Sequence, residues 1–599
     1  MMQSTISPSE KVNTELSDLG HAPTRRESSE EREDTPTTIF TNTTTGIGDD
    51  GNVLPVTHTY SKAPRREDGK IELCEDDCYK ELGFCFPEWK KWSILTVIFI
   101  VQTSMNFNAS IFANAISPMA EEFNVPVETA RHGQMVFLIA YAFGCELWAP
   151  WSEELGRWSI LQLSLFLVNV WQIPCALAQN PSTMLAGRFL GGLSSAGGSV
   201  TLGMVADMWE PNDQQFAVSY VVLSSVGGSV VAPIVGGFIQ QYLHWRWVFW
   251  IQLIFGVFAQ LLHYFACSET RSSVLLDRVA KGRRKAAKGQ GDDANVYGPN
   301  EIKGSLRHRL SFKEIVEIWT RPFIMFVKEP IVLCLSLLSG FSDALIFTFL
   351  ESYKPVFSQW NFGTIALGLA FIPLLVGYII AYFSFMPFFR RDRRARQLKG
   401  ADAVPPERRL YWLLYTAPLL TLGLFGFAWT SVGPPRVHWI APLVFSALVG
   451  IANYAIYMAT VDYMVAAYGP YASSATGGNG MARDFLAGIA ALYATPFYTN
   501  LPAPYTLEYP TTILACLAFV LTLPIYVFYW KGAWFRERSK FALNIAASRM
   551  ENEGRRTSNV SLARDVRKSQ KESSSRQGSR RSSPVGQRTP AGSRRPSLL

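Results

Sequence analysis

Twelve apolar segments, six on each side of a basic stretch of about sixty residues, constrain this chain more than any other feature. Each segment holds about 20 residues, and a helix of that length crosses a hydrocarbon core of roughly 30 Å. Clear examples are Trp92–Ala113, Gln134–Pro150, Val248–Ala266, Ile365–Phe383 and Thr511–Trp530. Lipid offers the backbone no hydrogen-bond partners, so segments of this length are expected to be helical. We therefore predict an all-α membrane protein with twelve transmembrane helices in two six-helix bundles.

Charged residues lie almost entirely outside the apolar segments, and the formal net charge is +8. Lysine and arginine gather after the sixth segment, at Arg278–Lys288, and after the eighth, at Arg390–Arg396. Loops rich in these residues stay in the cytoplasm, so we expect both termini and the central loop to be cytoplasmic. The expected location is the plasma membrane, with the vacuolar membrane as the alternative.

The sequence lacks the motifs of several function classes. Its positive charge belongs to loops and tails, so we expect no nucleic-acid partner. No phosphate-binding loop of the form GxxxxGK[ST] is present, which argues against an ATP-driven pump. None of the seven histidines falls in a metal-binding or base–nucleophile pattern, so we predict no enzyme, no metal site and no cofactor. The cluster of Cys74, Cys78 and Cys85 leaves two interpretations open, a metal site without histidine or a reduced segment beside the membrane.

The chain divides into five expected regions. Residues 1–90 are rich in Ser, Thr, Glu and Asp and are expected to form a disordered cytoplasmic tail. The two bundles occupy 91–268 and 330–533, the cytoplasmic central loop occupies 269–329, and 534–599 form a disordered basic tail. The tails repeat two arginines, any residue and a serine, at Arg25–Ser28, Arg555–Ser558, Arg580–Ser583 and Arg594–Ser597. These serines suit a basophilic kinase, and the alternative is a basic tail attracted to lipid.

The junction between the second and third segments, Gly144–Trp158, reads GCELWAPWSEELGRW. This stretch resembles the loop motif of the major facilitator superfamily, G-x-x-x-D-[RK]-x-G-R-[RK]. Gly156 and Arg157 match the motif and Glu153 stands at its aspartate, whereas its leading glycine and two of its basic residues are replaced. Gly156 permits a tight turn, and a carboxylate and a guanidinium can bridge helix ends. The resemblance therefore implies a breakable gating contact formed by Ser152, Glu153, Gly156 and Arg157.

Other stretches resemble the fungal drug:proton antiporter branch of this superfamily, which contains multidrug and polyamine exporters. They are Arg188–Gly198, Ser225–Gly237, His244–Trp250 and Ser268–Arg271. The resemblance covers about residues 90–535. In the fifth segment it implies an antiporter motif formed by Gly228, Pro233, Gly236 and Gly237. The alternative is that these residues serve helix packing and bending alone.

Ionisable residues inside apolar segments are costly and often mark transport pathways. Glu146 lies in the second segment, Arg188 in the fourth, and Arg483 and Asp484 in the eleventh. Adjacent helical residues point about 100° apart, so Arg483 and Asp484 cannot face one partner, and we expect one of them to pair with another helix. Asp462 is placed in the last turn of the tenth segment, where an interfacial role is the alternative to a pathway role. Here the sequence departs from the branch pattern, because its usual aspartate position is Ala466.

Asp343 is the strongest candidate for a proton-linked or cation-contacting carboxylate. It falls near the middle of the seventh segment, within Ile331–Leu350. Gly340 and Ser342 beside it would allow a local bend and access for water. By the resemblance, this segment borders a central cavity. The alternative is a carboxylate that a neighbouring helix satisfies.

Two six-helix bundles and an antiporter-like fifth segment imply a secondary active transporter. We predict export of small organic solutes, such as drugs, toxins or polyamines, by proton-coupled alternating access. The energy source is then the proton gradient, the partners are the solute, the proton and the lipid bilayer, and a monomer is expected. Two alternatives stay open: a facilitative or proton-symport nutrient permease, and a non-transporting membrane sensor.

Overall fold

The computed structural model describes residues 41–47, 53–59, 71–195, 197–209, 213–289, 295–302, 312–399, 404–468, 471–502, 504–539 and 541–542. The chain divides into two compact units, Met1–Lys62 and Ala63–Leu599. In the first unit, β1 (Thr41–Ile47) and β2 (Val53–Thr59) form an antiparallel hairpin with Thr41 opposite Thr59. Threonine and valine favour strands because branched side chains suit the pleated backbone. This hairpin departs from the structureless tail expected over 1–90, and the kinase patterns lie outside the described residues.

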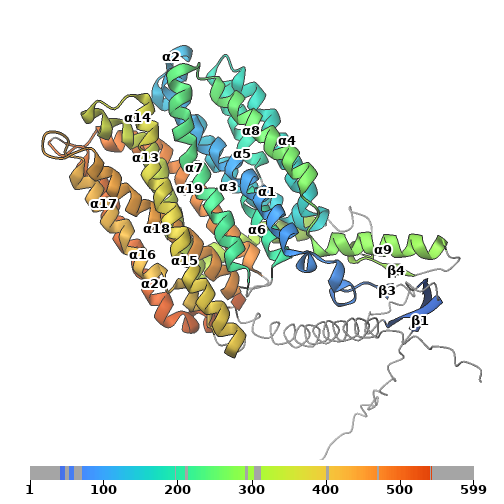
Figure 1. The fold of residues 1–599 in the computed structure, drawn as a ribbon. Helices are drawn as coiled ribbons and strands as arrows, with labels where there is room; N and C mark the ends of the chain where they lie inside the picture. Colours follow the sequence, from blue (N-terminus) through green and yellow to red (C-terminus); the bar gives the residue numbers. More distant parts are fainter. Residues whose placement is uncertain are drawn as a thin grey trace, which may run out of the picture. The chain divides into compact units, whose positions relative to one another are not determined.

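The second unit contains both helical bundles (Figure 1). The first bundle, blue to green in the figure, runs from α1 to α8. Its helices are α1 (Glu88–Ile111), α2 (Ile116–Phe123), α3 (Val127–Leu155), α4 (Arg157–Ala176), α5 (Pro181–Ser194), α6 (Gly197–Met208), α7 (Gln215–Tyr242) and α8 (Trp247–Ala266). A 3-10 turn, η3 (Phe112–Ala115), joins α1 to α2.

The second bundle, yellow to red, runs from α13 to α20. Its helices are α13 (Pro330–Phe357), α14 (Thr364–Leu369), α15 (Ile372–Lys399), α16 (Leu413–Thr416), α17 (Pro418–Thr430), α18 (Ile440–Tyr468), α19 (Ala472–Thr499) and α20 (Glu508–Arg538). The 3-10 helices η4 (Ser358–Trp360) and η6 (Pro406–Leu410) lie between them. The last helix continues five residues past the bundle boundary expected at 533.

In the described part of the chain, 10 helices are long and apolar enough to cross a membrane. The other two predicted spans are also helical, one as two shorter helices and the other as a single helix that contains charged residues. The fourth is divided into α5 and α6, and the backbone of Ser195 after α5 is extended. The eleventh is α19, which carries Arg483 and Asp484 among glycine, serine and alanine. The predicted all-α fold is confirmed.

Segments on both sides of the first bundle are folded against each other. The linker between the bundles contains α9 (Ser272–Gly289), β4 (Val296–Tyr297), α10 (Pro299–Ile302) and α12 (Phe312–Lys328). Before α1, the chain forms β3 (Ile71–Glu72), η1 (Glu75–Glu81) and η2 (Gly83–Cys85). β3 and β4 pair in parallel, with Ile71 opposite Val296. A small apolar cluster that includes Leu73, Leu82 and Leu276 lies between these segments. Residues expected to belong to a disordered tail and a loop are therefore structured here, because the leucines give them a core.

An ion pair closes the linker structure. Nη1 and Nη2 of Arg284 donate to the two carboxylate oxygens of Glu301, at 2.7 Å each. These hydrogen bonds lower the pKa of Glu301, whereas burial raises the pKa of Asp277 nearby. The stabilisation from Glu301 is therefore present at neutral pH and is lost as the pH falls through its lowered pKa.

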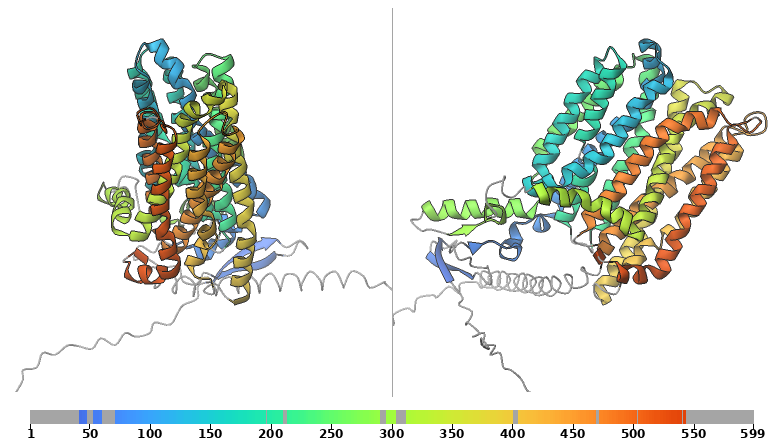
Figure 2. Two further views of the ribbon diagram at one scale, coloured as in Figure 1. Left: turned by 90° about the vertical axis from the view of Figure 1, so that its left-hand side faces the viewer. Right: turned by 180° about the vertical axis from the view of Figure 1, so that it is seen from behind.

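The end of the bundles at which α1 begins and α8 and α20 end is called the linker end, and the opposite end is the distal end. α9 runs crosswise beside the linker end, as the rear view shows (Figure 2). Between the bundles, α3 packs against α19, and α7 packs against α14, α15 and α18. Helices α3, α7 and α19 therefore carry the residues that can couple one bundle to the other.

Close packing of α1 against α7 depends on one of two adjacent glycines. A Cβ atom on Gly228 would lie 2.7 Å from the Thr103 carbonyl oxygen and 3.0 Å from Asn106 Cβ, whereas a Cβ on Gly227 would meet nothing within 4 Å. In lipid the hydrophobic effect contributes little to the association of helices, so close van der Waals packing of this kind contributes much of it. The first bundle thus needs a residue without a side chain at Gly228.

We predict that Gly228→Leu lowers the free energy of unfolding by about 1–3 kcal/mol, because the added side chain separates α1 from α7. Gly227→Leu is the matched control and should leave stability nearly unchanged. Thermal denaturation of the purified protein in detergent measures both. Equal losses in the two variants would contradict the packing described here.

Candidate functional site

A buried ion pair joins two helices of the second bundle. Asp343 Oδ1 on α13 and Arg483 Nη2 on α19 are 3.1 Å apart, and each side chain is only 7% exposed. The guanidinium of Arg483 also lies over the Tyr457 ring of α18, 3.5 Å from its centroid, which adds a cation–π attraction. Asp343 is therefore satisfied by a neighbouring helix in this conformation, and Arg483 is the member of the Arg483–Asp484 pair that binds another helix.

Small and polar residues bring α13, α18 and α19 together around this ion pair. A Cβ atom on Gly340 would lie 2.8 Å from the Ala482 carbonyl oxygen, so the α13 and α19 backbones nearly touch. From α18, the side-chain amide of Asn453 donates to the Ser342 carbonyl at 2.9 Å. The expected bend at Gly340 is instead a site of close helix approach, and α13 runs unbroken through it.

Two further carboxylates lie near the boundary of the bundles. Glu146 of α3 is 6% exposed, and one of its oxygens has no hydrogen-bond partner among the described residues. Its carboxylate lies against the backbone of α19, since a Cβ atom on Gly477 would lie 2.7 Å from Glu146 Oε2. Asp484 is half-buried and lies within electrostatic range of Tyr141 of α3. Both carboxylates sit between α3 and α19, which belong to different bundles, and neither forms an ion pair between bundles in the described residues.

Arg188 of α5 is a buried cation of the first bundle and is 1% exposed. Its guanidinium lies between two rings, 4.6 Å from the Phe112 centroid and 3.9 Å from the Phe137 centroid. It donates to Asn108 Oδ1 at 3.0 Å, while its Nη2 has no partner among the described residues. Aromatic rings and neutral acceptors thus surround Arg188, in contrast to the carboxylate beside Arg483.

At the linker end, Arg157 binds a residue that the sequence analysis did not single out. Its Nε lies 3.1 Å from Asp207 Oδ2 of α6, and both side chains are almost fully buried. Its Nη1 donates to Ser152 Oγ at 2.6 Å, whereas Glu153 is 3.8 Å away and one-third exposed. A Cβ atom on Gly203 would lie 2.6 Å from Arg157 Cζ, so this glycine makes room for the guanidinium. Asp207, not Glu153, is therefore the main acidic partner of Arg157.

The turn between α3 and α4 is held by Glu269, which follows α8. Gly156 has φ = 98°, a conformation that side chains other than glycine rarely adopt. Glu269 is 2% exposed and accepts hydrogen bonds from four backbone amides, those of Arg157, Trp158, Thr270 and Arg271. Its negative charge also lies at the start of α4, where the helix dipole favours it.

The second bundle meets α7 at the linker end through Asp462. Gln215 Nε2 of α7 donates to Asp462 Oδ2 at 2.7 Å, and Arg409 forms an ion pair with the other oxygen. Arg396 of α15 donates to Gln215 Oε1 at 3.4 Å. Asp462 does not lie in the last turn of its helix, as the sequence had suggested. Helix α18 continues to Tyr468, and Asp462 is buried at 2% exposure.

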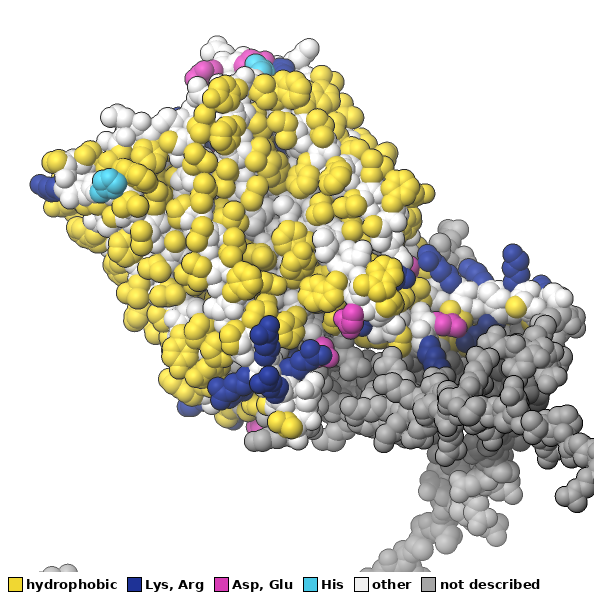
Figure 3. All heavy atoms as spheres, viewed as in Figure 1, with side chains coloured by type: hydrophobic (Ala, Val, Ile, Leu, Met, Phe, Trp, Pro, Cys, Tyr) yellow, Lys and Arg dark blue, Asp and Glu magenta, His cyan; other side chains and the backbone are white. Residues whose placement is uncertain are grey.

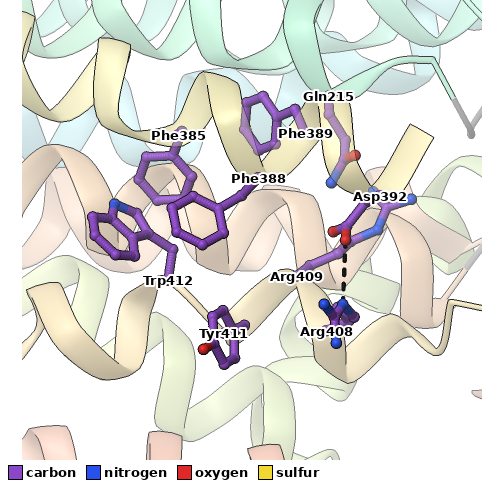
Figure 4. A pocket seen from close by; sticks show the side chains of 9 residues that line it. All are labelled: Gln215, Phe385, Phe388, Phe389, Asp392, Arg408, Arg409, Tyr411 and Trp412. Carbon is purple, nitrogen blue, oxygen red and sulfur yellow. Dashed lines mark hydrogen bonds and ion pairs between the residues drawn. The ribbon is translucent and has the colours of Figure 1, made fainter. Parts of the chain in front are cut away.

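Figure 4 shows Gln215 pointing toward Asp392 and Arg409, beside the rings of Phe385, Phe388 and Phe389. The Arg408–Asp392 ion pair, 3.2 Å long, is drawn there as a dashed line. The cavity among these side chains measures only about 10 Å³, which is close to the minimum for one water molecule. This part of the linker end is therefore closed.

A second set of contacts joins the bundles at the distal end. Arg131 Nε of α3 lies 3.1 Å from Glu351 Oε2 of α13, and Thr495 donates to the same oxygen at 3.0 Å. A Cβ atom on Gly368 of α14 would lie 2.7 Å from the Pro233 carbonyl oxygen of α7. The bundles are thus connected at both ends in this conformation.

The four residues singled out on α7 lie against three neighbouring elements, α1, η3 and α14. Gly228 meets α1, and Gly236 meets Asn114 in η3, 3.1 Å from its Cβ by the same measure. Pro233 and Gly237 face α14 of the other bundle, where a Cβ on Gly237 would lie 3.0 Å from the Thr364 carbonyl oxygen. The packing interpretation accounts for all four positions, and Pro233 and Gly237 additionally lie at the boundary between bundles.

Several residues of the site lay outside the sequence-based candidates, among them Asp207, Glu269, Gln215 and Glu351. Glu269 lies within Ser268–Arg271, an element that the resemblance had already identified, and Asp207 is a carboxylate near the end of an apolar segment. Gln215 is a neutral residue, and nothing in the sequence around it indicates a contact between the bundles. In the described residues, no group of three or more His, Cys, Asp or Glu side chains is placed to hold a metal ion.

We predict that Asp207→Asn destabilises the protein by about 3–5 kcal/mol, because it leaves the Arg157 guanidinium buried without its main partner. Glu153→Gln is the control and should cost no more than about 1 kcal/mol, since that contact is long and exposed. Thermal denaturation of the purified variants in detergent measures both changes in stability. The double variant Asp207→Asn/Arg157→Gln should lose less stability than the sum of the two single variants. A loss for Glu153→Gln as large as that for Asp207→Asn would refute this assignment.

Comparison with known proteins finds transporters of fungi. The MFS-type transporter acdC of Aspergillus candidus is 30% identical over 460 residues, which cover 76% of this chain and 87% of that protein. The citrinin biosynthesis cluster MFS transporter mrr1 of Monascus ruber is 30% identical over 469 residues, covering 77% and 90%. Among solved structures, the proton:xylose symporter XylE superimposes with a TM-score of 0.52 over 74% of this chain and 96% of that one. Its sequence identity is 16%, so this likeness concerns the fold alone.

The family model described as Major Facilitator Superfamily matches residues 98–492. This range begins in α1, ends in α19 and includes Glu146, Arg188, Asp343 and Arg483. The relatives are transporters and not enzymes. The chain therefore belongs to the major facilitator superfamily of multi-pass membrane transporters.

Proposed function

We propose that this protein exports small organic metabolites by proton-coupled alternating access, as a member of the drug:proton antiporter branch. The names of relatives support the substrate class, because they include transporters of the citrinin and ascochitine biosynthesis clusters. In this proposal the linker end and both termini face the cytoplasm, since the arginines of α9 and α15 gather at the linker end. The protein works as a monomer in the plasma membrane and uses the proton gradient without a further cofactor.

The observation that carries the proposal is the Asp343–Arg483 ion pair at 3.1 Å, buried inside the second bundle. Charge inside a membrane-spanning bundle is costly, and it is retained chiefly where an ion or proton moves. When Asp343 takes up a proton, the attraction to Arg483 is lost and α13 and α19 can shift relative to each other. Because α19 also contacts α3, this shift reaches the boundary with the first bundle. Glu146 and Asp484, the carboxylates at that boundary, would receive or pass on the proton.

Alternating access requires contacts between the bundles that break at one end while they hold at the other. The linker end supplies Gln215–Asp462 at 2.7 Å, and the distal end supplies Arg131–Glu351 at 3.1 Å. Each contact includes a charged group, which makes its hydrogen bond stronger than one between neutral groups. When that end opens, water can replace the lost partner of each group. The Arg157–Asp207 contact lies within the first bundle and stiffens it.

The surroundings of Arg188 favour neutral or acidic aromatic solutes over polyamines. A buried guanidinium without an acidic partner among the described residues repels a polycation strongly, because the protein interior screens charge poorly. Arg188 Nη2 and Asn108 Nδ2 both lack partners in the described residues, so they can donate to oxygen atoms of a solute. Phe112 and Phe137 beside them provide faces for aromatic rings.

We predict that Asp343→Asn removes the pH dependence of efflux, because asparagine cannot exchange a proton. The change also lowers stability, since Arg483 stays buried without its carboxylate partner, so efflux is normalised to the amount of folded protein in the membrane. Efflux of radiolabelled aromatic acids and polyamines from expressing cells is measured across external pH, with and without an uncoupler. Glu537→Gln is the control, since that carboxylate is exposed at the end of α20. Unchanged pH dependence in Asp343→Asn would defeat the role of Asp343. Uncoupler-insensitive transport would favour a facilitative permease, and no transport of any compound would favour a sensor.

The two interbundle contacts should respond in opposite ways. Asp462→Asn weakens the attraction to Arg409 and Gln215, so we predict faster amide hydrogen exchange at the linker ends of α7 and α18. Glu351→Gln weakens the distal contact and should instead raise exchange at the distal ends of α3 and α13. Hydrogen-exchange mass spectrometry on both variants provides the comparison, each serving as the control for the other. The same pattern in both variants would mean that these contacts do not govern separate ends.

A further inference from the structure

A cavity of about 820 Å³ opens between the two bundles at the linker end. The first bundle contributes the start of α1, the end of α6 and the start of α7, and the second bundle contributes the end of α15. We call it the interbundle crevice. Figure 3 shows basic side chains gathered at the lower end of the bundles, directly below a broad hydrophobic surface. The crevice thus lies where the apolar spans end and charged residues begin.

Positive charge dominates the lining of the interbundle crevice. Arg390, Arg393 and Arg394 reach it from α15, and Lys91 reaches it from α1. Arg393 pairs with Asp213 at 2.9 Å, while no ion pair joins Lys91, Arg390 or Arg394 to a described residue. Glu88 is the remaining acidic residue of the lining, so two carboxylates face four cations.

Lys91 shows that the crevice suits an anion in particular. The residue is only 7% exposed, and its ammonium nitrogen lies 5.7 Å from the centroid of the Trp209 ring. A buried ammonium without a carboxylate is costly, and an anionic ligand would remove that cost. Trp92 packs edge-to-face on Trp209 with centroids 6.1 Å apart, so the wall behind Lys91 is aromatic. Arginines and a lysine converging on one space are the groups that proteins use to bind phosphate.

The surface beside the crevice indicates a lipid as the source of the phosphate. Along α15, about two to three turns before Arg390, exposed apolar side chains include Ile380 at 51% and Phe383 at 64% exposure. An acyl chain can lie on this surface while its headgroup enters the crevice. Basic pockets between membrane helices bind acidic headgroups in this way. A free phosphate compound would gain nothing from the apolar surface.

We infer that the interbundle crevice binds the phosphate-bearing headgroup of an acidic phospholipid, through Lys91 of the first bundle and Arg390 and Arg394 of the second. Because its ligands come from both bundles, the lipid holds the linker end in the closed arrangement seen here. Opening that end separates the cations and releases the headgroup. An acidic leaflet would then bias the conformational equilibrium of the transporter. This inference does not depend on the substrate or on proton coupling.

The test uses the full-length protein in detergent with dioctanoyl phosphatidic acid as the probe. Thermal stabilisation and native mass spectrometry should both show binding, and Arg390→Gln/Arg394→Gln should raise the Kd about tenfold or more. Both arginines are exposed, so their replacement should not impair folding. Arg391→Gln is the control, because it removes one positive charge from the same part of α15 but lies outside the lining; Arg394→Gln alone is compared with it charge for charge. Dioctanoyl phosphatidylcholine should not bind at this site.

Each outcome decides the inference. Loss of binding in the double variant, with normal binding in Arg391→Gln, supports it. Equal binding by the double variant and the wild type would overturn it, and so would equal loss in both variants, since that would indicate a non-specific charge effect. If inorganic phosphate or glycerol phosphate stabilises the protein as well as the lipid does, the crevice is a site for free phosphate and the lipid assignment is overturned. If the double variant does not fold, Arg394→Gln alone is read by the same criteria.

Discussion

Buried charge is the constraint on which this structure depends, because each bundle encloses a guanidinium that lipid cannot solvate. The second bundle satisfies Arg483 with the Asp343 carboxylate and the face of Tyr457. The first bundle satisfies Arg188 with two phenylalanine rings and neutral oxygen atoms. A carboxylate can be neutralised by a proton, whereas rings and amides keep their interaction with the cation at any pH. One bundle therefore contains a contact that protons can switch, and the other contains a fixed cation.

The position of these charges also explains why the helices that carry them are so rich in small residues. Asp343 and Arg483 can meet because Gly340 lets α13 approach the α19 backbone, and Glu146 can enter the boundary because Gly477 has no side chain. Small residues thus determine where charge can be buried. The same residues make α19 too polar and α5–α6 too broken to rank among the apolar spans.

Much of the fold could be predicted from the sequence, because the length and hydropathy of a membrane span are local properties. The turn at Gly156, the buried charges and the pairing of one residue of Arg483–Asp484 were likewise evident from local pattern. Partners were not. Asp207 lies 50 residues from Arg157 in the sequence, and Gln215 lies 247 residues from Asp462, so only the packing of helices brings them together. The folded segments around β3 and β4 escaped prediction for a related reason, since their few leucines form a core only when 71–85 meets 272–297.

The position of Glu269 has a mechanical consequence. Its carboxylate is bonded to amides at the start of α4 and to amides of the turn that follows α8, so it fixes the distance between these two helix ends. Arg157, in the same turn, is anchored to α6 through Asp207. Three helices of the first bundle are therefore braced at one level and cannot slide past one another independently. A displacement of one of these helices therefore moves the other two, and at this end the three helices move as one rigid body.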